Sequence, residues 1–240
     1  MTTFVSNAGR CVSGRARVSA TGVLLAAGAL LAVSIPTSAF AQTAPVCGPD
    51  IKEEVANAIT ALDGLDDATR LGREKELYAK YSYCAQDSAQ ASASFFEAAR
   101  QCGASVSNLG STFFEEMSCS GYDPQRRQFA SPIKIKQSFG FGGTPLPGSR
   151  EHVLNCVADP AGAFRPVGHD SVHLSNAPGK TPTWQFAVIA AANNTLGLVQ
   201  PRDGATRRAR SILSWAFTPT DCNYTPIWGN ALNYRIRLDQ

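Results

Sequence analysis

The residues best suited to chemistry are the three histidines, because all of them lie within one stretch of 22 residues. His169 and His173 are four residues apart, a spacing at which one face of a helix could present both imidazoles to a metal ion. The alternation of Val172 and Leu174 with polar residues predicts a strand instead, along which the two rings would lie roughly 13 Å apart. Both rings would then point outward. We predict no metal site and no cofactor, although His152 could approach either ring from a neighbouring strand.

Asp170 adds a carboxylate to the same stretch, residues 152–173, and a carboxylate beside imidazoles can support acid–base hydrolysis. The four residues Asp170-Ser-Val-His173 resemble the Asp-x-x-His pattern that supplies the acid and the base of GDSL-type hydrolases. The chain has no Gly-Asp-Ser block that would supply the serine nucleophile of those enzymes. An exported hydrolase that uses His169, Asp170 and His173 is therefore our alternative hypothesis.

Candidate binding residues lie closer to the C-terminus. Arg207, Arg208 and Arg210 form the densest basic cluster, and Arg202 lies shortly before them. Such a cluster can face solvent, pair with acidic residues of this chain or of a second copy, or bind an anionic partner. Trp228 follows a turn-rich stretch, where we expect an exposed ring that could stack on a sugar.

The first 41 residues have the features of a secretory signal peptide. They contain Arg10, Arg15 and Arg17 and no acidic residue, and an apolar run ends in the small-x-small pattern Ala39-Phe-Ala41. No second run in the mature chain is long and apolar enough to span a membrane. We therefore expect a secreted or periplasmic protein, with the cell surface as a further destination.

The cysteines predict a disulfide framework. Of the seven cysteines, Cys11 lies in the leader, and the six others remain in the mature chain. An even number of cysteines in an oxidising compartment predicts three disulfides. Antiparallel packing of the first two expected helices favours one of the three ways to pair the first four thiols. The expected bridges join Cys47 to Cys84, Cys102 to Cys119, and Cys156 to Cys222.

Charge divides the mature chain near residue 123. Residues 42–123 contain 6 basic and 13 acidic side chains, a net charge of −7, and residues 124–240 contain 13 basic and 6 acidic ones, a net charge of +7. The mature chain is therefore neutral as a whole. Nucleic-acid binding requires a net basic surface, so we do not expect a nucleic-acid partner.

Apolar periodicity predicts helices in the acidic segment. Three helices are expected from Pro49 to Gly64, from Asp67 to Cys84, and from Asp87 to about Gly103. Thr112 and Glu115 have the spacing of a capping box, which predicts a short fourth helix that would expose Glu115 and Glu116.

The basic segment alternates between apolar and polar residues and is interrupted by turn residues, which predicts about seven short strands. The expected strands are 133–141, 151–158, 171–175, 183–191, 195–200, 209–218 and 232–238. The predicted fold class is α+β, with a signal peptide (1–41), a disulfide-linked helical domain (42–123) and an antiparallel β-sandwich-like domain (124–240).

These features together favour a non-enzymatic protein of the bacterial envelope. Export, disulfides and a sandwich-like segment suit a protein that acts in binding or assembly. The charge asymmetry predicts contact with an envelope protein, a glycan or another anionic surface, or self-association.

Overall fold

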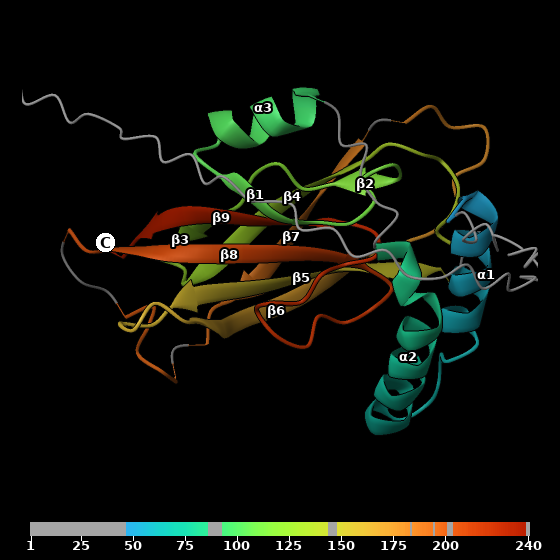
Figure 1. The fold of residues 1–240 in the computed structure, drawn as a ribbon, viewed down its shortest axis with the longest axis horizontal. Helices are drawn as coiled ribbons and strands as arrows, with labels where there is room; N and C mark the ends of the chain where they lie inside the picture. Colours follow the sequence, from blue (N-terminus) through green and yellow to red (C-terminus); the bar gives the residue numbers. More distant parts are fainter. Residues whose placement is uncertain are drawn as a thin grey trace, which may run out of the picture. The chain divides into compact units, whose positions relative to one another are not determined.

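The computed structural model describes residues 47–85, 93–143, 148–182, 184–193, 195–200 and 204–238. The expected signal peptide, Asp87 and Arg202 lie outside these residues. Residues 44–240 form one compact unit with two antiparallel sheets; two helices lie at one end of the strands and a third lies along one side (Figure 1).

The helices follow the local signals of the sequence. They are α1 (Pro49–Thr60), α2 (Asp67–Tyr81), a single 3-10 turn (Ser82–Ala85) and α3 (Ala93–Gln101). Pro49 occupies the first turn of α1, where its missing N–H costs no hydrogen bond. The side chain of Asp66 accepts a hydrogen bond from the backbone N–H of Thr69 and thereby caps α2.

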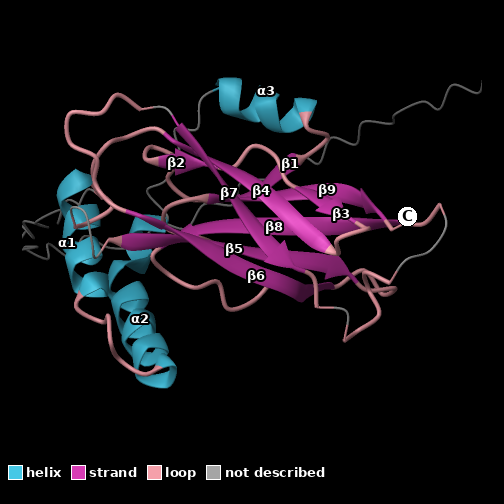
Figure 2. Cartoon of the chain, turned by 180° about the vertical axis from the view of Figure 1, so that it is seen from behind, coloured by secondary structure: helices cyan, strands magenta, loops and turns pink. Residues whose placement is uncertain are grey.

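Nine strands make up the two sheets. Their bounds are β1 (Ser105–Leu109), β2 (Glu115–Glu116), β3 (Gly121–Asp123), β4 (Gln128–Ile135), β5 (Ser149–Ala158), β6 (Phe164–Leu174), β7 (Trp184–Ala191), β8 (Thr206–Trp215) and β9 (Asn230–Arg237). The larger sheet has the order β1-β9-β8-β5-β6. In the smaller sheet, β4 pairs with β7 along one edge and with β2 and β3 along the other, and Figure 2 shows this sheet lying across the larger one.

Strand alternation places one core between the sheets. Val153, Leu213 and Leu232 from the larger sheet are fully buried in the same cluster as Phe129 and Ile133 from β4. The arrangement is therefore α+β and sandwich-like, as the sequence predicts.

The expected fourth helix is wrong. Glu115 and Glu116 form strand β2, which pairs with Ile135 and Lys134 of β4. Thr112 is buried, and its hydroxyl caps no helix. Pairing with β4 has overridden the local pattern. A two-residue match to a capping box stabilises a helix only slightly, and the pairing of β2 with β4 stabilises the strand more.

Strands from both sides of residue 123 share the two sheets. In the acidic segment, β1 pairs with β9, and β3 pairs with β4. The division near residue 123 therefore marks a change in charge and composition within sheets that contain strands from both segments. Residues 195–200 form turns instead of the expected strand, and β4 ends at Ile135, before the expected residue 141.

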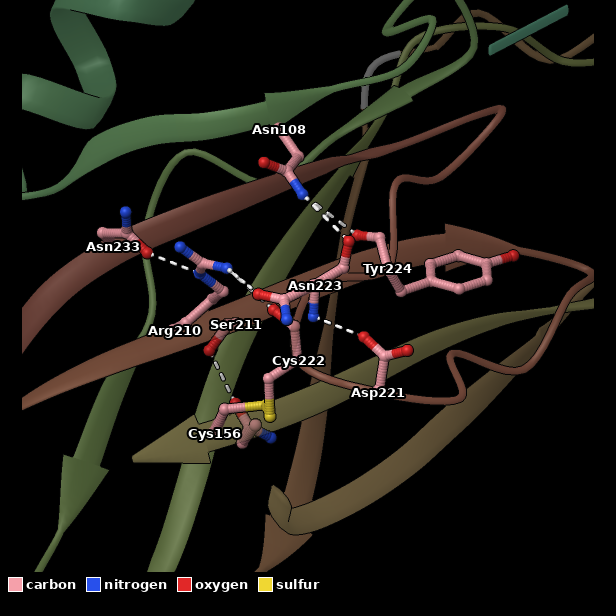
Figure 3. Close-up of a disulfide and its surroundings, with 10 residues drawn as sticks. Asn108, Cys156, Arg210, Ser211, Asp221, Cys222, Asn223, Tyr224 and Asn233 are labelled. Atoms are coloured by element: carbon pink, nitrogen blue, oxygen red, sulfur yellow. Dashed lines mark hydrogen bonds between the residues drawn. A yellow bond between two sulfur atoms is a disulfide. The ribbon is translucent and has the colours of Figure 1, made fainter. Parts of the chain in front are cut away.

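All three expected disulfides are present. Cys47–Cys84 joins the start of α1 to the turn after α2, and Cys102–Cys119 joins the end of α3 to the segment between β2 and β3. Cys156–Cys222 connects β5 to the loop that follows β8 (Figure 3).

Candidate functional site

The histidine segment forms β6 and part of β5, and two of its imidazoles meet. Nδ1 of His152 lies 3.2 Å from Nε2 of His169, and the two rings stack with 5.3 Å between their centroids. Leu174 is buried and Val172 packs against the same core, so the rings of His169 and His173 lie on the other face of β6, as predicted. Within the described residues, no group of three or more His, Cys, Asp or Glu side chains could hold a metal ion.

The residues of the hydrolase hypothesis are not arranged as a triad. Nε2 of His173 accepts a hydrogen bond from the backbone N–H of Gly148, at 3.1 Å. Oδ1 of Asp170 accepts one from the backbone N–H of Ser171. In the described part of the chain, no carboxylate forms a salt bridge with an imidazole, so the structure shows no acid that would orient His169 or His173 as a base.

The basic cluster lies on β8, and its members face opposite ways. Arg208 and Arg210 alternate with the buried residues Ala209 and Ser211, so they lie on the outer face of the larger sheet. Arg207, the second residue of β8, lies on the opposite face of the sheet from Arg208 and Arg210. Arg202, the fourth predicted member, is outside the described residues.

Arg210 uses its guanidinium group for hydrogen bonds within the protein. Its Nε donates to Oδ1 of Asn233 at 2.7 Å, and its Nη1 donates to the carbonyl of Cys222 at 2.8 Å (Figure 3). Its guanidinium also lies 4.4 Å from the ring centre of Phe164. Arg210 therefore holds the Cys222 loop against the sheet.

Arg208 lies at the surface and is joined by two arginines that the sequence analysis missed. Arg235 of β9 lies directly opposite Arg208 in the strand register, and Arg100 approaches from the end of α3. These three side chains, with Phe164 and Asn233, line a depression of about 450 Å³. We call this surface the arginine groove.

The arginine groove concentrates positive charge without matching carboxylates. Arg100 pairs with Glu97, but no described carboxylate lies within 4.0 Å of the guanidinium nitrogens of Arg208 or Arg235. Like charges directly opposite each other on neighbouring strands destabilise a sheet. Burial, and then the charge of Arg208, lower the pKa of the Arg210 guanidinium. The groove thus has an electrostatic cost that a bound anion would relieve.

Trp228 is not exposed as we expected. It is only 1% exposed, and its ring packs edge-on against Trp215 in the core. Trp184, at the start of β7, is the tryptophan that remains partly exposed. It lines a pocket of about 470 Å³ together with Phe186 and Lys180. Trp184 therefore replaces Trp228 as the candidate for stacking on a sugar.

The structure also reveals a buried cluster of charged residue types that the sequence analysis missed. Lys52 of α1, Glu115 of β2 and Glu151 of β5 are all fully buried. Nζ of Lys52 lies 2.6 Å from Oε2 of Glu115. The only local signal was the placement of Lys52 close to the apolar face of α1, and nothing in the sequence joins it to a residue 63 positions away.

Comparison of the chain with protein-family models, with curated protein sequences and with solved structures finds no match. Among the described helices, none is both long enough and apolar enough to cross a membrane. Functional inference therefore depends on the sites described above.

Proposed function

We propose that the mature chain is an exported protein of the bacterial envelope that binds an anionic partner through the arginine groove and does not catalyse a reaction. The observation that carries this proposal is the pair Arg208 and Arg235, which face each other without a described carboxylate partner. Guanidinium groups bind phosphate and carboxylate groups through charge-assisted hydrogen bonds. The partner's chemistry is thus a phosphate- or carboxylate-bearing glycan, lipid or protein surface.

Two further features support this proposal. Three disulfides suit an oxidising compartment outside the cytoplasm, in agreement with the expected leader. The groove is open to solvent, and the Phe164 ring lies 5.5 Å from the Arg208 guanidinium, which suits an extended anionic partner.

The hydrolase hypothesis has weaker support. The paired rings of His152 and His169 could exchange a proton, but the described residues provide no acid to orient them. Replacement of both His169 and His173 by Gln should abolish hydrolysis if that hypothesis holds, and should leave binding through the arginine groove intact.

The test is the affinity of the mature oxidised protein for fluorescein-labelled heparin, measured by fluorescence anisotropy at low and at high salt. The variant R208Q/R235Q removes the two guanidinium groups that have no described carboxylate partner and keeps most of each side chain. We expect its affinity to fall at least about tenfold, because a hydrogen bond to a charged group contributes roughly 1.5 kcal/mol or more.

The matched control is R73Q/K75Q, which also removes two positive charges, but from exposed positions of α2. This variant should bind heparin like the native protein. Equal losses in the two variants would mean that binding depends on net charge alone, and the groove would then not be the site.

A further inference from the structure

The cluster of Lys52, Glu115 and Glu151 brings an amine and two carboxyl groups together inside the core. Each of the three residues is 0% exposed. The amine nitrogen Nζ of Lys52 is 2.6 Å from Oε2 of Glu115. Glu151 interacts electrostatically with both of these groups. One possible amide bond, between Lys52 and Glu115, would require little movement of either side chain.

Aromatic rings enclose the amine. Nζ of Lys52 lies 3.9 Å from the ring centre of Phe114, 4.5 Å from that of Phe141 and 4.6 Å from that of Trp215. Rings at these distances stabilise a cation but also exclude water. A condensation that releases water is favoured in such a site, because the product water leaves for the bulk and the reacting groups lack the hydration that keeps them ionised.

The hydrogen bonds of the cluster are incomplete for an ion pair. Oε1 of Glu115 and both carboxylate oxygens of Glu151 are buried and accept no hydrogen bond in the described structure. A stable buried ion pair normally has its remaining lone pairs satisfied. Two carboxylates and one ammonium group would also leave a net negative charge in the core.

Burial favours the neutral forms of these groups. Desolvation lowers the pKa of the Lys52 amine against the opposing effects of Glu115, Glu151 and Glu53. Desolvation also raises the pKa of Glu115. The pKa of Glu151 is raised well above its usual value, first by desolvation and second by the charge of Glu115. A neutral amine and a neutral carboxylic acid are the forms that condense.

We infer that Lys52 and Glu115 form an intramolecular amide cross-link, with Glu151 as the proton carrier. Nζ of Lys52 attacks the side-chain carboxyl carbon of Glu115 and forms the C–N bond. Protonated Glu151 donates its proton to the leaving oxygen of Glu115 and, through its other carboxyl oxygen, takes a proton from Nζ. The C–O bond breaks, one water leaves, and Glu151 returns to its protonated form. No oxidant or reductant is consumed.

The cross-link would add a covalent bond to a helix that otherwise packs on the core of the sheets through Val55, Ala56 and Ile59. Lys52 lies in the first turn and a half of α1, and Glu115 belongs to the smaller sheet. The Cys47–Cys84 disulfide attaches the same end of α1 to the turn after α2. A second covalent bond, which reducing agents do not cleave, would suit a protein exposed to proteases outside the cell.

The test is the intact mass of the mature oxidised protein under denaturing conditions. We expect a mass lower than that of the chain with three disulfides by the mass of one water molecule. Fragmentation after trypsin digestion should show the peptide that contains Lys52 joined to the peptide that contains Glu115. A mass that corresponds to the three disulfides alone would overturn the inference and leave a buried ion pair.

The position of the water loss matters, because Asp63-Gly64 and Asp203-Gly204 can also lose water by forming succinimides. A loss that maps to either of these sites would also overturn the inference. Gln42 at the expected new N-terminus loses ammonia when it cyclises, and the mass distinguishes this change.

Two matched variants test the role of Glu151. E151Q removes the proton carrier and keeps the size of the side chain, so we expect a protein without the water loss. E116Q changes the neighbouring buried glutamate, which pairs with Lys134 and Lys136, and should retain the cross-link. A cross-link that forms equally in both variants would contradict the role of Glu151. K52M should abolish the cross-link, and the native mass alone decides the inference if this variant does not fold.

Discussion

His152 should make the stability of the protein fall as the pH decreases. Its side chain is buried and stacked on His169, and its Nε2 has no hydrogen-bond partner in the described structure. Burial lowers the pKa of His152 to about 3, with further contributions from His169, Arg150 and Arg70. The folded protein therefore keeps this imidazole neutral in mildly acidic solution.

The size of this loss of stability follows from the difference between the pKa of His152 in the folded protein and its pKa in the unfolded chain. Above pH 6.5, the ordinary pKa of histidine, the imidazole is neutral in both states and pH has no effect through this group. Between pH 6.5 and about 3, the unfolded chain binds a proton that the folded protein does not bind. The free energy of unfolding should fall by about 1.4 kcal/mol per pH unit over this range, or about 2 kcal/mol at pH 5.

The assay is urea unfolding of the mature oxidised protein at pH 7.5 and pH 5, compared with the variant H152N. Asn places a polar atom near the position of Nδ1 and does not titrate. The variant should lose about 2 kcal/mol less than the native protein between the two pH values. The other titrating groups are the same in both proteins, so the difference between the proteins isolates His152. H173Q is the control for the loss of an imidazole that does not stack on another ring.

Equal losses of stability in the native protein and in H152N would refute this reasoning. That result would mean that His152 gains its proton without unfolding, and so that burial does not keep it neutral in the folded protein.

Two further changes should lower stability, each measured as the free energy of unfolding in urea. Replacement of both Cys156 and Cys222 by Ala should cost about 4 kcal/mol, because the bridge closes a loop of 67 residues in the unfolded chain; no loss would mean that this bridge does not restrict the unfolded chain. N230A should cost about 2–4 kcal/mol, because the buried amide of Asn230 bonds both the N–H and the carbonyl of Met117, at 2.9 and 2.8 Å. N57A, at an exposed position of α1, is its control, and an equal effect of the two variants would contradict the expected cost.

The helices and the main strands could be predicted because their signals are local. Asp66 caps α2, and Pro49 marks the start of α1. Alternation in the C-terminal segment places Leu232 and Ile236 inward on β9. The disulfide pairing followed once the first two helices were expected to lie antiparallel. Each of these inferences needs only neighbours in the sequence.

The strands between residues 105 and 123 could not be predicted in this way. β1 pairs with β9, where Ser105 lies opposite Asn233, 128 residues away, whereas β3 pairs with β4, the next strand in the sequence. Short strands with half-exposed side chains lack a clear alternation, and the capping-box pattern at Thr112 pointed to the wrong element. Pairing with other strands decided the structure of this segment, and for β1 that pairing is nonlocal.

The candidate site was predictable only in part for the same reason. The arginines of β8 are adjacent in the sequence, and they stood out as a cluster. The outward position of Arg235 follows from the alternation around Tyr234, but its place opposite Arg208 depends on the strand register, which the sequence does not reveal. Phe164 reaches the same surface from β6.

Two of the three disulfides attach helices, which backbone hydrogen bonds do not join to the sheets. The strands hold one another through their ladders, but a helix completes its hydrogen bonds internally and attaches to a sheet through side chains alone. Cys47–Cys84 fastens α1 and α2 together, and Cys102–Cys119 fastens α3 beside the smaller sheet. The inferred bond between Lys52 and Glu115 would connect α1 to the sandwich itself. Each link thus constrains an element whose attachment would otherwise depend on packing.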